Sequence, residues 1–345
     1  MSLLQETCGA ITGRSLEIER NIIDSWNTAS PVERYGRLVN MVAQYGAATN
    51  QETLAVPKPC MIIASADHGV ADMGVSAYPK ETTVGMTQNY LIPKGAGANS
   101  LANYCGAQME VIDMGIDADM SWVPGLRSHK LGMGTKNFVE EPAMTREQAI
   151  EGIETGIRLV KEKIDEGFNV FLVGEMGISN TTASALMTAK FAGLTAEEAT
   201  GRGTNISDER LKLKQRIVHD VLEKYKNIPK DDAIGILSSV GGFEFACIVG
   251  VILGAAANHG LVIIDGFNTS ACALVAKTLV PQVMDYVMAS HLSAEKAAKS
   301  SLENLGLEAY VDLGLCLGEA SGGSIQMGML DLAVHMYLAL TGGKA

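Results

Sequence analysis

Short, continuously apolar runs alternate along the chain with longer stretches in which apolar residues recur at helical spacing. Such runs are typical of strands that lie buried in a parallel sheet covered by helices on both faces. The runs that we predict to be strands are Met61–Ala64, Met109–Asp113, Val170–Gly174, Ala233–Leu237 and Leu261–Asp265. The pattern therefore predicts an α/β fold built on a parallel sheet.

The clearest helical pattern lies between two of these runs. Thr145 and Gln148 have the spacing of a capping box at its start, and Gly167 is expected to end the helix before Val170. Between these ends one apolar face repeats about every 3.6 residues. A second, more heavily charged helix is predicted from about residue 208 to residue 226.

Both ends of the chain read as helical and contain no strand-like run. We expect residues 1–49 and 306–345 to form a small helical domain beside a large α/β domain of residues 50–305. In open α/β sheets the ligand binds at the carboxyl ends of the strands. The loops at that edge are therefore the first candidates for function.

Composition narrows the class of protein. Of the 345 residues, 47% are hydrophobic and 19% are charged, which suits a large folded core. A net charge of −12 opposes binding to nucleic acid or to an anionic membrane surface, so we expect neither partner. The six cysteines are dispersed and are interpreted as reduced core residues. The apolar run 245–257 is interpreted as a buried helix, and the start has no signal-peptide pattern, so we expect a cytoplasmic protein.

The segment Gly174–Thr182 follows a predicted strand and precedes a helical run. Ser179, Asn180 and the two threonines are residue types that begin helices, so backbone N–H groups there would suit a phosphate. Glu175 at the strand tip is placed to accept hydrogen bonds from ribose hydroxyls. An ordinary capped helix explains the same pattern, and the residues alone do not decide between the two.

Two further segments invite a chemical interpretation. Gly201–Asn205 is a flexible turn followed by Lys212 and Lys214, which suits phosphate binding but also fits a loop before a solvated charged face. Glu319 lies among small residues in an apolar segment, an environment that raises the pKa of a carboxyl and favours general-base chemistry. A helix-capping glutamate at a surface turn is the alternative.

Other reaction classes have little support. Asp67 and His68 follow the first strand and are interpreted as structural, and no second ligand at a suitable spacing indicates a metal site. The sequence contains no nucleophile elbow of the G-x-S-x-G type, no Walker loop and no HExxH motif. These absences argue against a hydrolase, a nucleotide triphosphatase and a zinc protease.

Taken together, the segments resemble the nicotinate-nucleotide:dimethylbenzimidazole phosphoribosyltransferase family of cobamide biosynthesis. Seven motifs occur in the family's order and spacing from about residue 55 onward. They are Ala66–Val70, Gly174–Thr182, Val240–Phe243, Leu253–Ala256, Asp265–Phe267, Ser290–Glu295 and Leu317–Gly322. The resemblance implies a Rossmann-like parallel sheet flanked by helices, with the small helical domain built from both termini. It also implies a dimer, either a homodimer or a heterodimer with a paralogous subunit.

Carried over by position, the resemblance implies that Glu319 is the catalytic base. It implies that Glu175, Gly177 and Lys214 bind the ribose phosphate of nicotinate mononucleotide, although the sequence leaves Lys212 open as the phosphate ligand. No cofactor and no metal are expected, because the pyridinium leaving group departs as a neutral ring. What the reaction needs is a base for the proton of the incoming lower-ligand base, together with firm positioning.

One pair of residues departs from the family pattern. Tyr78 and Met86 stand where members that use dimethylbenzimidazole commonly have a serine and a glutamine. Tyrosine is bulkier than serine, and methionine cannot address an azole nitrogen as glutamine does. We therefore hypothesise a different acceptor, such as phenol, p-cresol or a purine, or pairing with a diverged paralogous subunit.

Two alternative functions follow from the same residues. A non-catalytic or half-site subunit of a heterodimeric phosphoribosyltransferase would share the fold, but the retention of Glu319, Glu175 and Lys214 argues against it. An oxidoreductase on a Rossmann-type sheet is the other alternative. It lacks a convincing G-x-G-x-x-G after the first strand.

Overall fold

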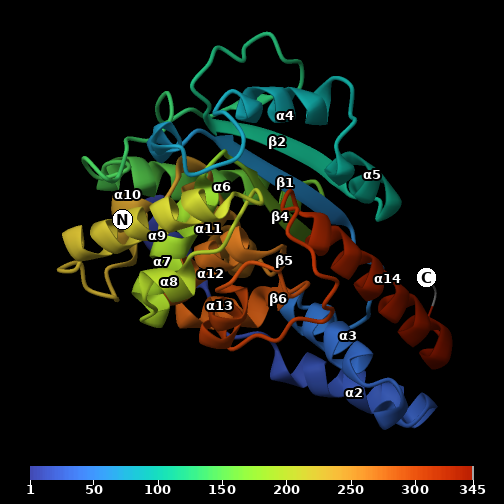
Figure 1. Ribbon diagram of the computed structural model, residues 1–345. Helices are drawn as coiled ribbons and strands as arrows, with labels where there is room; N and C mark the ends of the chain where they lie inside the picture. The colour runs from blue at the N-terminus through green and yellow to red at the C-terminus, as the bar shows by residue number, and fades with distance from the viewer. Residues whose placement is uncertain (344–345) are drawn as a thin grey trace.

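A six-stranded parallel sheet forms the centre of the computed structural model, which describes residues 1–343 (Figure 1). The strands are β1 (Pro59–Ala66), β2 (Gln108–Gly115), β3 (Arg127–Ser128), β4 (Val170–Met176), β5 (Leu261–Ile264) and β6 (Val287–Ala289). They follow the order β3-β2-β1-β4-β5-β6, and every neighbouring pair is parallel. The order reverses between β1 and β4, which is the Rossmann-like arrangement that places a ligand crevice at the carboxyl ends of these strands. The predicted α/β fold is confirmed.

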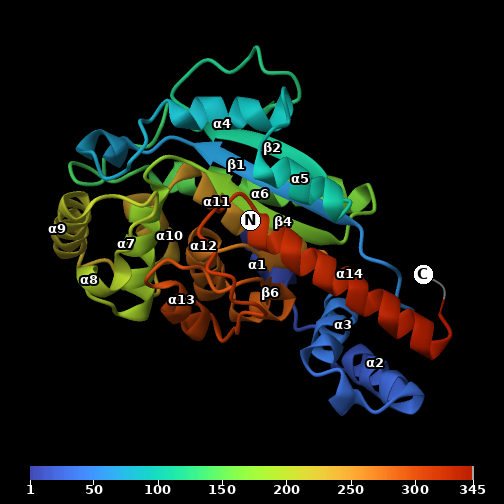
Figure 2. The ribbon, with the colours of Figure 1, turned by 45° about the vertical axis from the view of Figure 1, so that its right-hand side comes forward.

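Helices cover both faces of the sheet (Figure 2). The helix α11 packs against β1, β2, β4 and β5 on one face and is itself covered by α6, whereas α4, α5 and α14 contact strands on the other face. The helices are α1 (Leu3–Ala10), α2 (Leu16–Ala29), α3 (Arg37–Ala48), α4 (Thr82–Leu91), α5 (Gly97–Tyr104), α6 (Arg146–Asp165), α7 (Asn180–Ala192), α8 (Ala196–Ala199), α9 (Asp208–Lys224), α10 (Ala233–Val240), α11 (Phe243–Ala257), α12 (Phe267–Leu279), α13 (Ala298–Leu305) and α14 (Ser321–Thr341).

The helix α6 forms as its sequence predicts. Thr145 and Gln148 make the capping box, and Gly167 adopts a left-handed φ of 90° just after the helix. A Cβ on Gly250 of α11 would lie 1.9 Å from the backbone oxygen of Ile153 in α6. Only glycine therefore allows the buried helix α11 to approach α6 this closely, and the apolar face of α6 packs directly over it.

One predicted strand is wrong. Residues Ala233–Leu237 belong to α10, a helix buried along its whole length. The Asp232 side chain caps this helix by accepting a hydrogen bond of 2.9 Å from the Gly235 N–H. A short apolar run that is buried on every side carries no periodicity, so its pattern does not separate helix from strand. The short strands β3 and β6 were not predicted.

The two ends of the chain meet beside the sheet. The helix α14 packs along α2 and α3, whereas α1 packs on α6 and α11 of the larger part. The contacts of α14 agree with a helical unit built from both termini, whereas α1 contacts the larger part instead. The predicted domain boundaries therefore stay a prediction. Residues 344 and 345 of the expected small domain lie outside the described residues.

The cysteines only partly match their interpretation as core residues. Cys60, Cys247 and Cys272 are buried, but Cys316 is exposed at the rim of a cavity. The interpretation is therefore wrong for Cys316. The apolar run 245–257 lies in the buried helix α11, as predicted. Within residues 1–343, no helix combines the length and hydrophobicity that a membrane crossing requires.

Candidate active site

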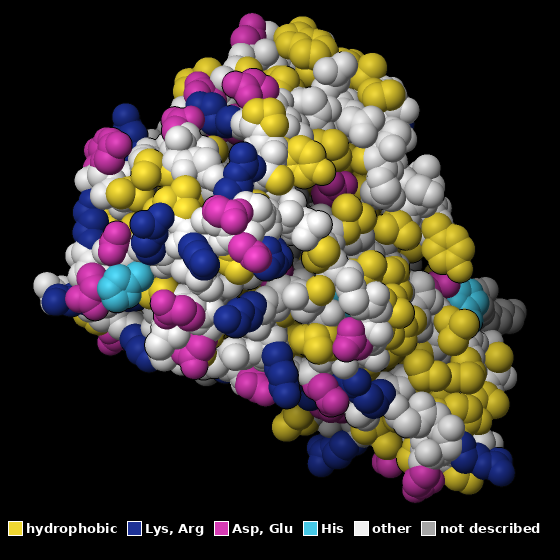
Figure 3. Space-filling model, in the orientation of Figure 1, with side chains coloured by type: hydrophobic (Ala, Val, Ile, Leu, Met, Phe, Trp, Pro, Cys, Tyr) yellow, Lys and Arg dark blue, Asp and Glu magenta, His cyan; other side chains and the backbone are white. Residues whose placement is uncertain are grey.

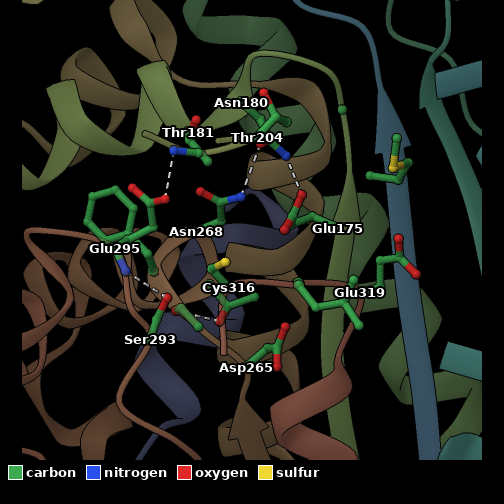
Figure 4. Close-up of a pocket in the computed structure, with 18 of the residues that line it drawn as sticks. Glu175, Asn180, Thr181, Thr204, Asp265, Asn268, Ser293, Glu295, Cys316 and Glu319 are labelled. Carbon is green, nitrogen blue, oxygen red and sulfur yellow. Dashed lines mark hydrogen bonds between the residues drawn. The ribbon is translucent and has the colours of Figure 1, made fainter. Parts of the chain in front are cut away.

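A cavity of about 560 Å³ opens at the carboxyl ends of β4 and β5 (Figure 4). Its wall includes the loops that lead into α7, α12 and α14, and a segment from α4. The cavity lies at the carboxyl edge of the sheet, where open α/β sheets bind ligands, and is one strand along from the reversal between β1 and β4. Of the residues proposed from the sequence, Tyr78, Met86, Glu175, Gly177 and Glu319 all line it.

The loop between β4 and α7 ends in an unusual helix start. Ser179 has a left-handed φ of 77° and its side chain makes no capping hydrogen bond within the described part of the chain. The hydroxyls of Ser179 and Thr182 are buried, and neither finds a partner among residues 1–343. The capped-helix alternative therefore does not describe this turn, because the Ser179 side chain does not cap α7.

Gly177 lies at the tightest point of this loop. A Cβ at this position would lie 2.5 Å from the Ala66 backbone oxygen and 3.2 Å from the His68 ring. His68 is fully buried beneath the loop, where its Nε2 lies 2.6 Å from Oε1 of Glu244. The His68–Glu244 pair thus supports the loop from below and is not part of the cavity wall.

Lys214 of α9 lies one layer behind the cavity wall. Its side chain is 1% exposed, and Nζ donates to Oγ1 of Thr181 at 2.8 Å and to the Gly201 oxygen at 3.4 Å. Burial lowers the pKa of Lys214 to about 8, and the charge of Glu295 opposes that shift. Lys212, the alternative phosphate ligand, is exposed. The buried lysine is therefore the one whose charge reaches the start of α7.

Glu175 lies near the carboxyl end of β4, with 7% of its surface exposed. Burial raises the pKa of this carboxyl to about 7, while hydrogen bonding by Asn268 and Asn180 lowers it and the charge of Glu244 raises it further. Glu175 is thus poised between its two protonation states near neutral pH. Titratable groups shifted in this way in a cleft are typical of functional sites.

Glu319 precedes α14 and faces the same cavity. Glu319 and Ala320 both have a φ of 59°, a left-handed backbone that is costly for residues other than glycine. The turn packs directly on β4, because a Cβ on Gly174 would lie 2.6 Å from the Ala320 nitrogen. Burial raises the pKa of Glu319, and the nearby Tyr90 hydroxyl works against this rise. A half-desolvated carboxylate held in strained backbone is suited to accept a proton.

The two residues that depart from the family pattern lie at the outer wall. Tyr78 is 57% exposed at the rim, and Met86 is half-buried on α4. Both line the cavity together with Ile178 and Leu317. This side of the cavity is apolar and flat aromatic rings would pack well against it.

Sequence reasoning missed several residues that the fold brings to the cavity. Asp265 accepts hydrogen bonds from the Gly322 and Gly323 N–H groups at 2.6 and 3.2 Å, which fixes the start of α14. Glu295 accepts one from the Gly203 N–H at 2.8 Å and holds the glycine-rich loop. Asn268 lines the cavity from α12. The signal for all three was their place in or beside the motifs Asp265–Phe267 and Ser290–Glu295.

Within residues 1–343, no group of three or more His, Cys, Asp or Glu side chains is arranged to hold a metal ion. His291 is buried, with Nδ1 3.1 Å from Oγ of Ser290 and 4.0 Å from Oδ1 of Asp265. It lines the cavity, and Gly322 packs against its ring.

An uncapped helix start, glycine-rich loops and two buried carboxylates at the open edge of a Rossmann-like sheet define an enzyme that binds a sugar phosphate and transfers it. Comparison with known proteins agrees with this class, since the family model described as phosphoribosyltransferase matches residues 16–342. The chain belongs to the nicotinate-nucleotide–dimethylbenzimidazole phosphoribosyltransferase family, as the seven motifs predicted.

Individual relatives support this membership over nearly the whole chain. The protein of this name from Geobacter sulfurreducens is 43% identical over 310 residues, which cover 90% of this chain and 88% of the relative. That from Chloroflexus aggregans is 39% identical over 96% of this chain and 94% of the relative. A crystal structure of CobT from Thermus thermophilus is similar with a TM-score of 0.88 and 32% identity, covering 95% of this chain and 99% of that one.

Proposed function

We propose that this chain transfers the phosphoribosyl group of nicotinate mononucleotide to an aromatic lower-ligand base in cobamide nucleotide-loop assembly. The observation that carries the proposal is that Glu319 shares one cavity with the uncapped start of α7. One cavity therefore offers a proton acceptor for the incoming base and a phosphate site for the donor. The names of the relatives describe the same donor and dimethylbenzimidazole as acceptor.

The phosphate binds at the start of α7. Gly177, Asn180 and Thr181 of this loop line the cavity and offer polar groups to its oxygens. Lys214 supplies positive charge from behind Thr181, with which it shares a hydrogen bond. Glu175 accepts hydrogen bonds from the ribose hydroxyls, so its carboxylate form is the one that binds.

The reaction exchanges one bond at the anomeric carbon for another. The bond to the nicotinate ring nitrogen breaks, and the ring keeps the electron pair, so its positive charge disappears. The acceptor's nitrogen or oxygen attacks from the opposite face and gives the α-ribotide, while Glu319 takes the acceptor's proton. A well-placed base contributes roughly 10²–10⁴-fold to such a step.

The acceptor lies between Tyr78 and Met86. Neither side chain gives the directed hydrogen bond that a glutamine gives to the second azole nitrogen. Phenols and purines therefore compete with dimethylbenzimidazole in this pocket, because contact with the ring face and not the azole decides binding.

We also propose that the protein works as a dimer, either with itself or with a paralogous subunit. Figure 3 shows hydrophobic side chains gathered along the α14 side of the molecule. Leu332 and Leu340 of α14 are 60% and 39% exposed, and Tyr104, which lies against the same helix near Gly328, is 85% exposed. Apolar side chains exposed in this way on a soluble surface are typical of an association site.

The test is an assay of the purified chain alone. Nicotinate mononucleotide is mixed in turn with dimethylbenzimidazole, adenine, phenol and p-cresol, and products are identified by mass spectrometry. Release of nicotinate with an α-ribotide supports the proposal and names the acceptor. If no acceptor gives product unless a paralogous chain is added, the half-site alternative replaces it.

A further inference from the structure

A directed chain of side-chain hydrogen bonds leads from Ser184 of α7 to the carboxylate of Glu175, and Figure 4 shows its last part, from Asn268 through Asn180 to Glu175. Oγ of Ser184 donates to Oδ1 of Asn268 at 2.6 Å, and Nδ2 of Asn268 donates to Oδ1 of Asn180 at 3.1 Å. Nδ2 of Asn180 then donates to Oε2 of Glu175. The chain therefore joins α7 and α12 to the tip of β4 through three neutral side chains.

The direction of this chain depends on the charge of Glu175. An ionised carboxylate only accepts hydrogen bonds, so Asn180 must turn its NH₂ group toward Glu175 and its oxygen toward Asn268. Asn268 must then present its own NH₂ group to Asn180 and its oxygen to Ser184. Each amide thus holds the next in the orientation that an ionised Glu175 requires, and Ser184 fixes the far end.

The surroundings of Glu175 otherwise oppose its charge. The carboxylates of Glu244 from α11 and Asp265 after β5 face it, and both raise its pKa. His68 beneath the loop and Tyr90 of α4 also lie within its electrostatic reach. His68 is already paired to Glu244, so its charge is largely compensated there. The groups that favour the ionised form of Glu175 are the amides of Asn180 and Asn268.

We propose that Asn268 is a positioning residue for ribose binding, acting together with Asn180 to keep Glu175 ionised and aimed into the cavity. This inference rests on the proposed function, because it takes Glu175 to be the acceptor for the ribose hydroxyls. Asn268 is the suitable residue to test because it is half-buried and lies outside the loop that binds the phosphate. Asn180 lies in the first turn of α7, so its replacement would also disturb that loop.

The experiment measures the affinity for nicotinate mononucleotide by calorimetry from about pH 5.5 to about pH 7.5, where Lys214, whose pKa is about 8, is still mostly protonated. The variants are Asn268→Asp, which keeps the size and the Ser184 bond but removes the donor, and Asn268→Ala, which adds no charge. Glu175→Gln reports on the carboxylate itself. Asn304→Asp on the exposed face of α13 is the matched control.

The wild type is expected to bind more tightly as pH rises through about 7, the pKa of Glu175. Both Asn268 variants should move this midpoint upward, so that affinity falls about tenfold at neutral pH and recovers toward the alkaline end. Asn304→Asp should follow the wild type, and Glu175→Gln should bind weakly and keep only the midpoint at about pH 6 that belongs to the phosphate of the ligand.

Three results would overturn the inference, and they are distinguishable. If the Asn268 variants weaken binding equally at every pH, or not at all while Glu175→Gln binds weakly, Asn268 does not act through Glu175. If Glu175→Gln binds as the wild type does, the assignment of Glu175 to the ribose is wrong. If the wild type does not bind nicotinate mononucleotide, the proposed function itself fails and the inference falls with it.

Discussion

Replacement of Lys214 by methionine should separate binding from stability, because the structure makes the two effects opposite in sign. Burial lowers the pKa of Lys214 from 10.5 to about 8, a difference that corresponds to roughly 3 kcal/mol of destabilisation when the lysine is charged. Methionine has a similar length and no charge to desolvate. The lost hydrogen bond to Thr181 offsets about 1 kcal/mol of the gain. We therefore expect Lys214→Met to raise the free energy of unfolding by about 2 kcal/mol at pH 7.

The sign of the pH dependence follows from the same shift. Between about pH 8 and pH 10.5 the unfolded chain holds a proton on this lysine that the folded chain has released, so the wild type gains stability as pH rises. The difference between wild type and variant should therefore shrink across that range. Urea unfolding followed by circular dichroism at several pH values measures it.

Binding should change in the opposite direction. Loss of the charge behind Thr181 should weaken affinity for nicotinate mononucleotide by about tenfold to a hundredfold, the usual contribution of a hydrogen bond to a charged group. Lys212→Met is the matched control, since Lys212 is exposed on the same helix, and its stability should stay within about 0.5 kcal/mol of the wild type. The reasoning is refuted if Lys214→Met is less stable at every pH, or if Lys212→Met loses affinity instead.

Three further changes have definite expected outcomes. Met86→Gln should raise kcat/KM for dimethylbenzimidazole relative to p-cresol, measured by competition, because glutamine addresses the azole nitrogen; an unchanged ratio would remove Met86 from acceptor choice. Gly250→Ala should lower the free energy of unfolding in urea by about 1–3 kcal/mol, because its Cβ would lie 1.9 Å from a backbone oxygen of α6. The control is Gly85→Ala, in open space on α4, which should be neutral or stabilising by up to about 1 kcal/mol. Equal effects of the two changes would contradict the packing argument. Leu332→Glu should shift sedimentation toward a monomer if the exposed side of α14 is the dimer contact, and an unshifted dimer would place the contact elsewhere.

The sheet was predictable because its central strands are continuous apolar runs bounded by clear helix signals. The capping box at Thr145 and the stop at Gly167 are local signals, and they mark both ends of α6 in the sequence itself. The run Ala233–Leu237 was wrongly predicted as a strand because it belongs to a helix that is buried on all sides. Such a helix has no polar face, so its sequence shows no helical period. The short β6 pairs only with β5, and nothing local distinguishes it from a loop.

The site was only partly predictable, since its geometry depends on contacts between distant segments. Glu175 and Glu319 could be selected from local pattern and family resemblance, and both line the cavity. The amide chain through Asn268 could not, because it joins residues 84 positions apart through hydrogen bonds that no spacing rule describes. The left-handed backbone at Ser179 and Glu319 could not be predicted either, because neither residue type favours that conformation.

The central claim is that Glu319 takes the proton of the incoming base in a phosphoribosyl transfer. The most direct measurement compares wild type with Glu319→Gln, following α-ribotide by mass spectrometry and binding of nicotinate mononucleotide by calorimetry on the same samples. We predict that the variant binds the donor with nearly unchanged affinity and forms product at least about 10²-fold more slowly. Unchanged product formation by Glu319→Gln would contradict the assignment of the base and require another proton acceptor in the cavity.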